Sequence, residues 1–77
     1  MLDPRYGTFE EWAISVVDDF SGDGLPLPAS EAEWRDWARI AAGSPTLATY
    51  GVPDPEGFDD WREWAGRALD AMETGIG

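Results

Sequence analysis

The chain contains no cysteine, no histidine and no lysine among its 77 residues. Without cysteine it forms no disulfide, and without histidine it lacks the commonest general base and the commonest transition-metal ligand. Its serines have no histidine or lysine nearby in sequence or elsewhere to activate them as nucleophiles. These absences predict a protein that is not an enzyme and that uses no cofactor.

Long apolar runs and basic segments are also missing. The longest apolar stretch, around residues 12–17, covers about two helical turns, whereas a membrane span needs roughly 20 residues. Residues 1–5 have neither the basic nor the apolar region of a secretory signal. We therefore expect no signal peptide and no transmembrane segment, and a protein that is soluble where it is made.

Positive charge is scarce. Five arginines face 16 acidic residues, and the net charge of −11 repels phosphate backbones and anionic lipid surfaces. The sequence thus predicts neither nucleic acid nor membrane as a partner. The alternative is an acidic mimic of nucleic acid that inhibits a host enzyme. Such a mimic needs carboxylates along one ridge with few cations between them, and here arginines are interspersed among the acids.

All five tryptophans lie in three related phrases. Two of the phrases, together with the prolines before them, agree at a constant offset of 27 residues: Pro26 and Pro28 correspond to Pro53 and Pro55. Agreement over this length indicates an internal duplication. The phrases are Phe9-Glu10-Glu11-Trp12-Ala13, Trp34-Arg35-Asp36-Trp37-Ala38 and Trp61-Arg62-Glu63-Trp64-Ala65.

Apolar residues at helical spacing predict an all-α fold of three short amphipathic helices joined by proline-rich connectors. Two capping boxes, Thr8 with Glu11 and Ser30 with Glu33, mark the starts of the first two helices. We expect either a small bundle with a tryptophan core or an extended helix–linker array; helices this short are marginal alone, which favours the bundle. The expected helices are Thr8–Phe20, Ser30–Ala42 and Gly57–Met72, within repeat-like units of one small domain at about 8–20, 26–42 and 53–72.

The connector over residues 43–56 is long for so small a protein. It carries three apolar residues, Leu47, Tyr50 and Val52. Loops of this length in a compact domain are uncommon unless they serve a purpose. We therefore expect the connector to pack against a neighbouring surface.

One stretch resembles the first half of a calcium-binding loop. Asp19, Ser21 and Asp23 would be ligands at positions 1, 3 and 5, with Gly24 at the turn position. Position 12 would be Ser30, where that loop needs a bidentate carboxylate. The alternative, a helix C-cap followed by a polar turn, accounts for these residues better.

The tryptophan phrases have two interpretations. Aromatic residues at helical spacing usually form a core. However, ten aromatic residues exceed what three short helices bury among themselves, and Trp, Tyr and Arg are enriched at the centres of protein interfaces. Trp64 is expected at the margin of its helix's apolar face and is the first candidate for contact with a partner. The candidate protein-interface residues are Trp34, Arg35, Trp37, Tyr50, Trp61, Arg62 and Trp64.

The order of capped helix, PxP, WRxWA, SP, PxP and WRxWA resembles short acidic proteins found among bacteriophage structural components. The matching residues are 9–13, 26–38, 44–45 and 53–65. The resemblance implies a virion-associated protein, made in the host cytoplasm, that binds other virion subunits in many copies. Its expected roles are a capsid cement or decoration subunit, or an adaptor near a tail or fibre.

Overall fold

The computed structural model describes residues 2–74, and all regular structure within them is helical. This confirms the all-α prediction. Short 3₁₀ turns lie at Ser21–Asp23, Glu31–Glu33 and Pro55–Gly57. The four α-helices are α1 (Phe9–Asp19), α2 (Trp34–Ala42), α3 (Pro45–Tyr50) and α4 (Trp61–Thr74).

The start of α1 matches the predicted capping box. The Thr8 hydroxyl accepts a hydrogen bond from the Glu11 backbone N–H at 3.2 Å, and the Glu11 carboxylate accepts one from the Thr8 backbone N–H at 3.2 Å. Two backbone donors that a helix start leaves unpaired are thereby satisfied. The sequence therefore located this helix start correctly.

The predicted start of α2 at Ser30 is wrong. The Glu33 N–H that the Ser30 hydroxyl was expected to bind donates instead to the Ser30 carbonyl at 3.1 Å, and the side chain of Ser30 makes no capping bond. This pairing defines a 3₁₀ turn, so the α-helix begins only at Trp34.

The predicted start of α4 at Gly57 is also too early. Phe58 is extended, with φ −120° and ψ 139°, so no helix passes through it. The carboxylate of Asp60 accepts a hydrogen bond from the Arg62 N–H at 3.2 Å, and α4 begins at Trp61. Helices α2 and α4 thus begin 27 residues apart, at the first tryptophan of each duplicated phrase.

Helix α3 was missed, because the sequence prediction treated residues 43–56 as one connector. Its signals are Ser44-Pro45 at the N-terminus and Gly51 after the C-terminus, where φ is +88° and a side chain would be strained. Leu47 on this helix is buried in the common core. The expectation that the connector packs against a neighbouring surface is confirmed.

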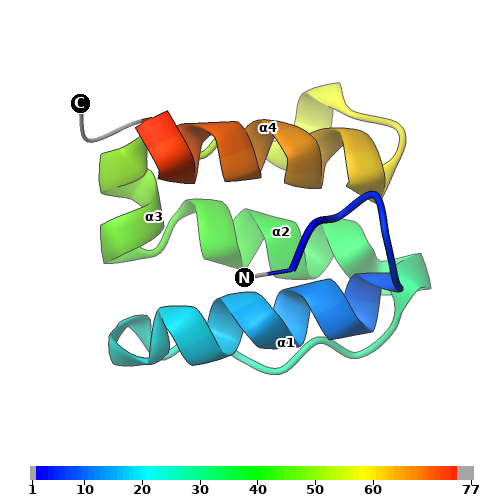
Figure 1. The fold of residues 1–77 in the computed structure, drawn as a ribbon, viewed down its shortest axis with the longest axis horizontal. Helices are drawn as coiled ribbons and strands as arrows, with labels where there is room; N and C mark the ends of the chain where they lie inside the picture. Colours follow the sequence, from blue (N-terminus) through cyan, green and yellow to red (C-terminus); the bar gives the residue numbers. More distant parts are fainter. Residues whose placement is uncertain (1, 75–77) are drawn as a thin grey trace.

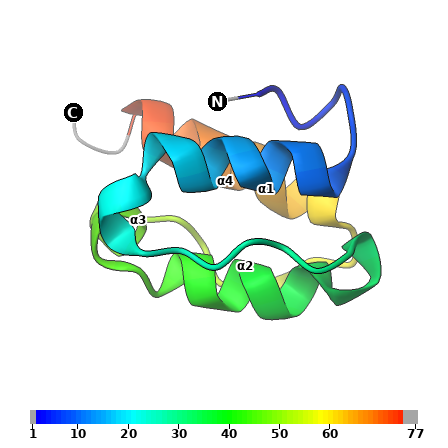
Figure 2. The ribbon, with the colours of Figure 1, turned by 90° about the horizontal axis from the view of Figure 1, so that it is seen from below.

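Helices α1, α2 and α4 run in the same direction, and α3 closes one end of the bundle (Figure 1). Because consecutive long helices are parallel, the connector between them has to return along the full length of a helix. Helix α1 has 11 residues, about 16 Å at 1.5 Å per residue. Five extended residues, 25–29, cover about the same distance at ~3.1 Å each. The prolines hold this return segment extended, and Figure 2 shows it crossing the molecule.

The tryptophans form the centre of a closed bundle with a radius of gyration of 10.9 Å. Trp12 of α1 meets Trp64 of α4 edge to face, with ring centroids 5.6 Å apart, and Trp37 of α2 at 6.0 Å. The alanines that close the three phrases are fully buried beside these rings: Ala13, Ala38 and Ala65. Of the two arrangements expected from the sequence, the structure shows the bundle.

Candidate functional site

The two duplicated units share a hydrogen bond that joins each helix to the connector before it. The indole Nε1 of Trp37 donates to the Pro26 carbonyl at 2.7 Å, and that of Trp64 donates to the Pro53 carbonyl at 2.7 Å. The spacing is 11 residues in both units. The equivalent Trp12 Nε1 is buried and has no hydrogen-bond partner within residues 2–74. The duplication in sequence is thus a duplication in structure.

This difference predicts unequal costs for the same substitution. Trp64→Phe and Trp12→Phe both shrink a buried ring, but only Trp64→Phe removes a hydrogen bond. We expect Trp64→Phe to lower the free energy of unfolding by about 1 kcal/mol more than Trp12→Phe. Urea unfolding of the two variants measures the difference, and equal losses would show that the Pro53 bond contributes nothing.

The arginine of each duplicated phrase lies over the preceding tryptophan and reaches another segment. The guanidinium carbon of Arg35 is 4.9 Å from the Trp34 ring centre, and that of Arg62 is 4.7 Å from the Trp61 ring centre. Arg62 donates to the carbonyl of Pro4 at 2.8 Å, and Arg35 donates to the carbonyl of Phe58. Both side chains therefore fasten non-helical segments to the bundle, through cation–π and hydrogen-bond contacts.

The other predicted interface residues lie in or against the core. Trp34, Trp37, Trp61 and Trp64 are between 1% and 8% exposed, and half-buried Tyr50 packs its ring against that of Phe20 at 5.9 Å. A partner could reach the four indoles only if the core opened.

The placement of Trp64 at the margin of its helix face was wrong. Trp64 is 1% exposed, and its ring lies near rings from both other long helices. The connector before α4 also folds back far enough for the Pro53 carbonyl to accept the indole proton. Because a returning connector covers this flank of the helix, the flank is not exposed. Helical periodicity does not reveal that cover.

The candidate calcium loop has a structural use in this fold. The carboxylate of Asp23 accepts hydrogen bonds from the Thr46 hydroxyl at 2.6 Å and from the Thr46 backbone N–H at 2.9 Å. It therefore caps the first turn of α3 from a distant part of the chain, while the Ser44 hydroxyl donates to the Ala41 carbonyl. Within residues 2–74 no three His, Cys, Asp or Glu side chains are grouped to hold a metal ion.

Asp23 gives the fold a defined response to acid. The hydrogen bonds from the hydroxyl and N–H of Thr46 hold the pKa of Asp23 below its ordinary value. A lowered pKa means that the carboxylate favours the folded state above about pH 4 and that this contribution is lost as the pH falls through the lowered pKa.

We therefore expect Asp23→Asn to be less stable than the parent chain at pH 7 and to lose less stability on acidification below about pH 4. Urea unfolding at pH 7 and pH 3 measures both effects. Asp18→Asn makes the same charge change on an exposed side chain and serves as the control. Parallel pH profiles for the parent and Asp23→Asn would contradict the capping role.

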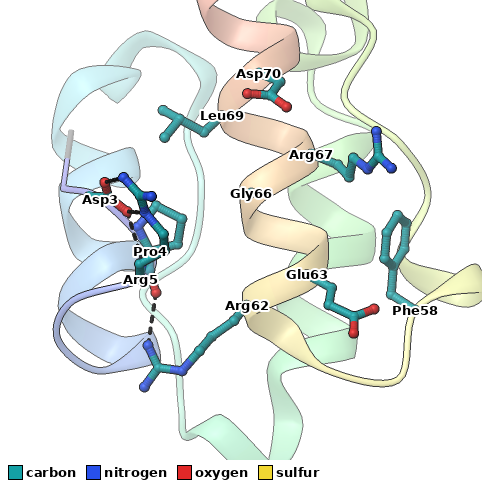
Figure 3. A pocket seen from close by; sticks show the side chains of 10 residues that line it. All are labelled: Asp3, Pro4, Arg5, Phe58, Arg62, Glu63, Gly66, Arg67, Leu69 and Asp70. Atoms are coloured by element: carbon teal, nitrogen blue, oxygen red, sulfur yellow. Dashed lines mark hydrogen bonds and ion pairs between the residues drawn. The ribbon is translucent and has the colours of Figure 1, made fainter.

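An open groove of about 490 Å³ on the described surface is lined by the N-terminal segment, Phe58 and α4 (Figure 3). Its apolar lining includes Pro4, Phe58 and Leu69. Three of the chain's five arginines line it, together with three acids. These charged residues are Asp3, Arg5, Arg62, Glu63, Arg67 and Asp70.

The charged side chains of the groove are distributed along its length, and several of them are bound within the chain. Arg5 pairs with Asp3 at 2.9 Å, and this hydrogen bond holds the pKa of Asp3 below its ordinary value. Arg62 is bound to Pro4, whereas Arg67 has no hydrogen bond or ion pair with another described residue. A catalytic site requires functional groups that converge on one point. Figure 3 shows these side chains spread along the groove.

Exposed apolar side chains are the other feature that bears on function. Leu27, on the first proline connector, is 72% exposed, and Ile40, on α2, is 54% exposed. Both line a second, smaller hollow. The large apolar residues exposed within the described chain are Leu2, Tyr6, Ile14, Leu27 and Ile40.

Comparison of the chain with models of known protein families, with curated proteins and with solved structures finds no match. In the described part of the chain, the helices are too short or too polar to cross a membrane.

Proposed function

We propose that this chain is a non-catalytic protein-interaction domain. The observation that carries the proposal is the division of its apolar residues. All five tryptophans are enclosed by the bundle, yet Leu27 and Ile40 are exposed beside one another at a single hollow. Exposed apolar side chains gathered at one place on a small domain are typical of a protein-binding surface.

We further propose that the partners are subunits of a bacteriophage particle, with the chain as a capsid cement or decoration subunit or a tail or fibre adaptor. Support comes from the resemblance of its phrase order to that of short acidic phage structural proteins. The two hollows also suit this role, because they lie on different sides of the domain. In Figure 2 the N-terminal segment is at the upper edge, whereas α2 and its connector lie in the lower half.

The test is the composition of the particle. Particles purified on a density gradient from the phage that carries the gene should contain the chain in a fixed ratio to the major capsid or tail subunit, measured by quantitative mass spectrometry. The ratio should persist after a second gradient. Absence from the particles, with the chain free in the infected cell, would contradict this assignment.

A second candidate function is an acidic inhibitor that imitates nucleic acid. The sequence argument against it was that arginines interrupt the acids. In the structure four of the five arginines are engaged by the chain's own oxygens: Arg5, Arg35, Arg39 and Arg62. Arg5 and Arg39 pair with carboxylates, whereas the carbonyls bound by Arg35 and Arg62 are neutral and leave those two charges in place. What supports this candidate is the net charge of −11, which leaves most of the 16 acidic residues without a cation.

This candidate makes a separate prediction about salt. A nucleic-acid mimic binds its enzyme through many charge contacts, so inhibition of host nucleases or polymerases should fall steeply between about 50 and 200 mM NaCl. The absence of inhibition at low salt, or inhibition unchanged by salt, would exclude the mimic.

A further inference from the structure

The hollow at Leu27 and Ile40, here called the Leu27 hollow, has a rigid apolar floor. It has a volume of about 160 Å³ and is also lined by Pro26 and by the edge of Trp37. Trp37 donates its indole proton to the Pro26 carbonyl at 2.7 Å, which fixes the connector to α2. Prolines on both sides of Leu27 restrict the backbone further. The surface is therefore formed before a partner binds, which reduces the entropy cost of binding.

The duplicated unit shows that the fold does not require apolar residues here. At the offset of 27 residues, Leu27 corresponds to Asp54 and Ile40 to Arg67, and both of these charged residues are exposed. The two units share the indole-to-proline hydrogen bond, so the positions are equivalent in structure. One unit thus places charged groups in water where the other places leucine and isoleucine. The fold therefore does not require Leu27 and Ile40 to be apolar at these exposed positions.

The two charged residues that line the Leu27 hollow are both acidic. Glu33, just before α2, and Asp36, on α2, line it and are both exposed. Asp36 also pairs with Arg39 at 3.3 Å, although no cationic residue among residues 2–74 lines the hollow itself. The net charge of the whole chain is also negative, at −11. A partner that places an apolar side chain here therefore gains from lysine or arginine beside that side chain, and an acidic partner is repelled.

We infer that the Leu27 hollow is the docking site for a cationic, apolar segment of a partner protein. The hollow, of about 160 Å³, is comparable with a cavity of ~150 Å³ that holds benzene, so it accommodates one leucine- or phenylalanine-sized side chain. Basic residues flanking that anchor pair with Glu33 and share Asp36 with Arg39. This inference rests on the proposed protein-interaction function and names the chemistry of the partner.

The experiment uses two synthetic amphipathic peptides and the full ¹⁵N-labelled chain. One peptide contains leucine and lysine; the other has the same leucine pattern with glutamate in place of lysine. We expect the leucine–lysine peptide to shift backbone amide signals around Leu27, Glu33, Asp36 and Ile40, and the leucine–glutamate peptide to leave them unchanged. Equal responses to both peptides, or no response to either, would overturn the inference.

A pair of matched variants separates docking from general charge attraction. Leu27→Asp with Ile40→Arg installs the residues that the duplicated unit carries, so the fold should persist while binding weakens at least about tenfold, or ~1.4 kcal/mol. Leu2→Asp with Ile14→Arg makes the same two changes at exposed positions outside the hollow, and binding should be retained. Equal binding by both double variants would show that the peptide coats the acidic surface, and would overturn the inference.

Two further outcomes are distinguishable. If dilution alone shifts the signals of the Leu27 hollow and sedimentation shows a dimer, a second copy of the chain occupies it and the cationic partner is wrong. If peptide binding maps to the hollow but the chain is absent from purified particles, the proposed virion role fails and this inference stands. If the chain is present in particles and the peptides do not reach the hollow, only this inference fails.

Discussion

Replacing Trp64 with alanine is expected to unfold most of the chain. Trp64 is 1% exposed, contacts rings from α1 and α2, and donates a hydrogen bond to the Pro53 carbonyl. Truncating a buried tryptophan to alanine costs about 3–5 kcal/mol. A domain of 77 residues has a total stability of roughly 4–12 kcal/mol at typical values per residue. The loss of one indole is therefore comparable with the whole free energy of unfolding.

Far-UV circular dichroism and thermal melting measure this effect. The matched control is Leu27→Ala, which truncates a side chain that is 72% exposed and should change stability by no more than about 0.5 kcal/mol. If Trp64 were a contact residue at the edge of its helix, Trp64→Ala would keep its helical signal and melting temperature. That outcome would contradict the enclosed core.

The second large effect on stability is expected from replacing a buried alanine with leucine. Ala65 closes the third tryptophan phrase, has no exposed surface and lies in the cluster of rings. A leucine there has to displace packed indoles, at a cost of about 1–3 kcal/mol or more. In a domain of this size each kcal/mol lowers the melting temperature by roughly 4–8 °C. We expect Ala65→Leu to melt well below the parent chain.

Ala48→Leu provides the comparison, because Ala48 is exposed on α3. The same substitution there adds a good helix former at the surface and should leave the melting temperature nearly unchanged. Equal melting temperatures for Ala65→Leu and Ala48→Leu would mean that Ala65 is not enclosed. This contrast also explains why each phrase ends in alanine: the residue after the second aromatic faces the centre of the bundle.

Local sequence signals identified three of the four described α-helices, but not all of their boundaries. Thr8 and Glu11 form a cap entirely within one turn, so their spacing was sufficient to place the start of α1. Ser30 and Glu33 have the same spacing, but a backbone 3₁₀ bond takes the Glu33 N–H. Which acceptor binds the Glu33 N–H depends on how the proline connector enters the helix. Tertiary contacts determine that entry. Helix α3 was marked by Ser44-Pro45 and Gly51, signals that the sequence prediction did not use.

The candidate site was harder to predict because it depends on contacts between distant segments. Periodicity placed Trp61 on an apolar face, but the cover over Trp64 comes from a connector 11 residues earlier that folds back along its helix. Similarly, the partner of Asp23 is Thr46, 23 residues away. The 27-residue offset did contain the comparison of Leu27 with Asp54 and of Ile40 with Arg67. Its meaning emerged only when the structure showed both pairs of positions at the surface.

Acrylamide quenching of tryptophan fluorescence in the isolated chain is the decisive measurement for the closed bundle. With all five indoles at most 8% exposed, the native chain should be quenched weakly. Quenching should then rise in a single cooperative transition as guanidinium chloride unfolds the chain. An extended helix–linker array predicts the opposite: strong quenching without denaturant and little change on adding it. That result would contradict the enclosed tryptophan core and would mean that a partner can reach the indoles.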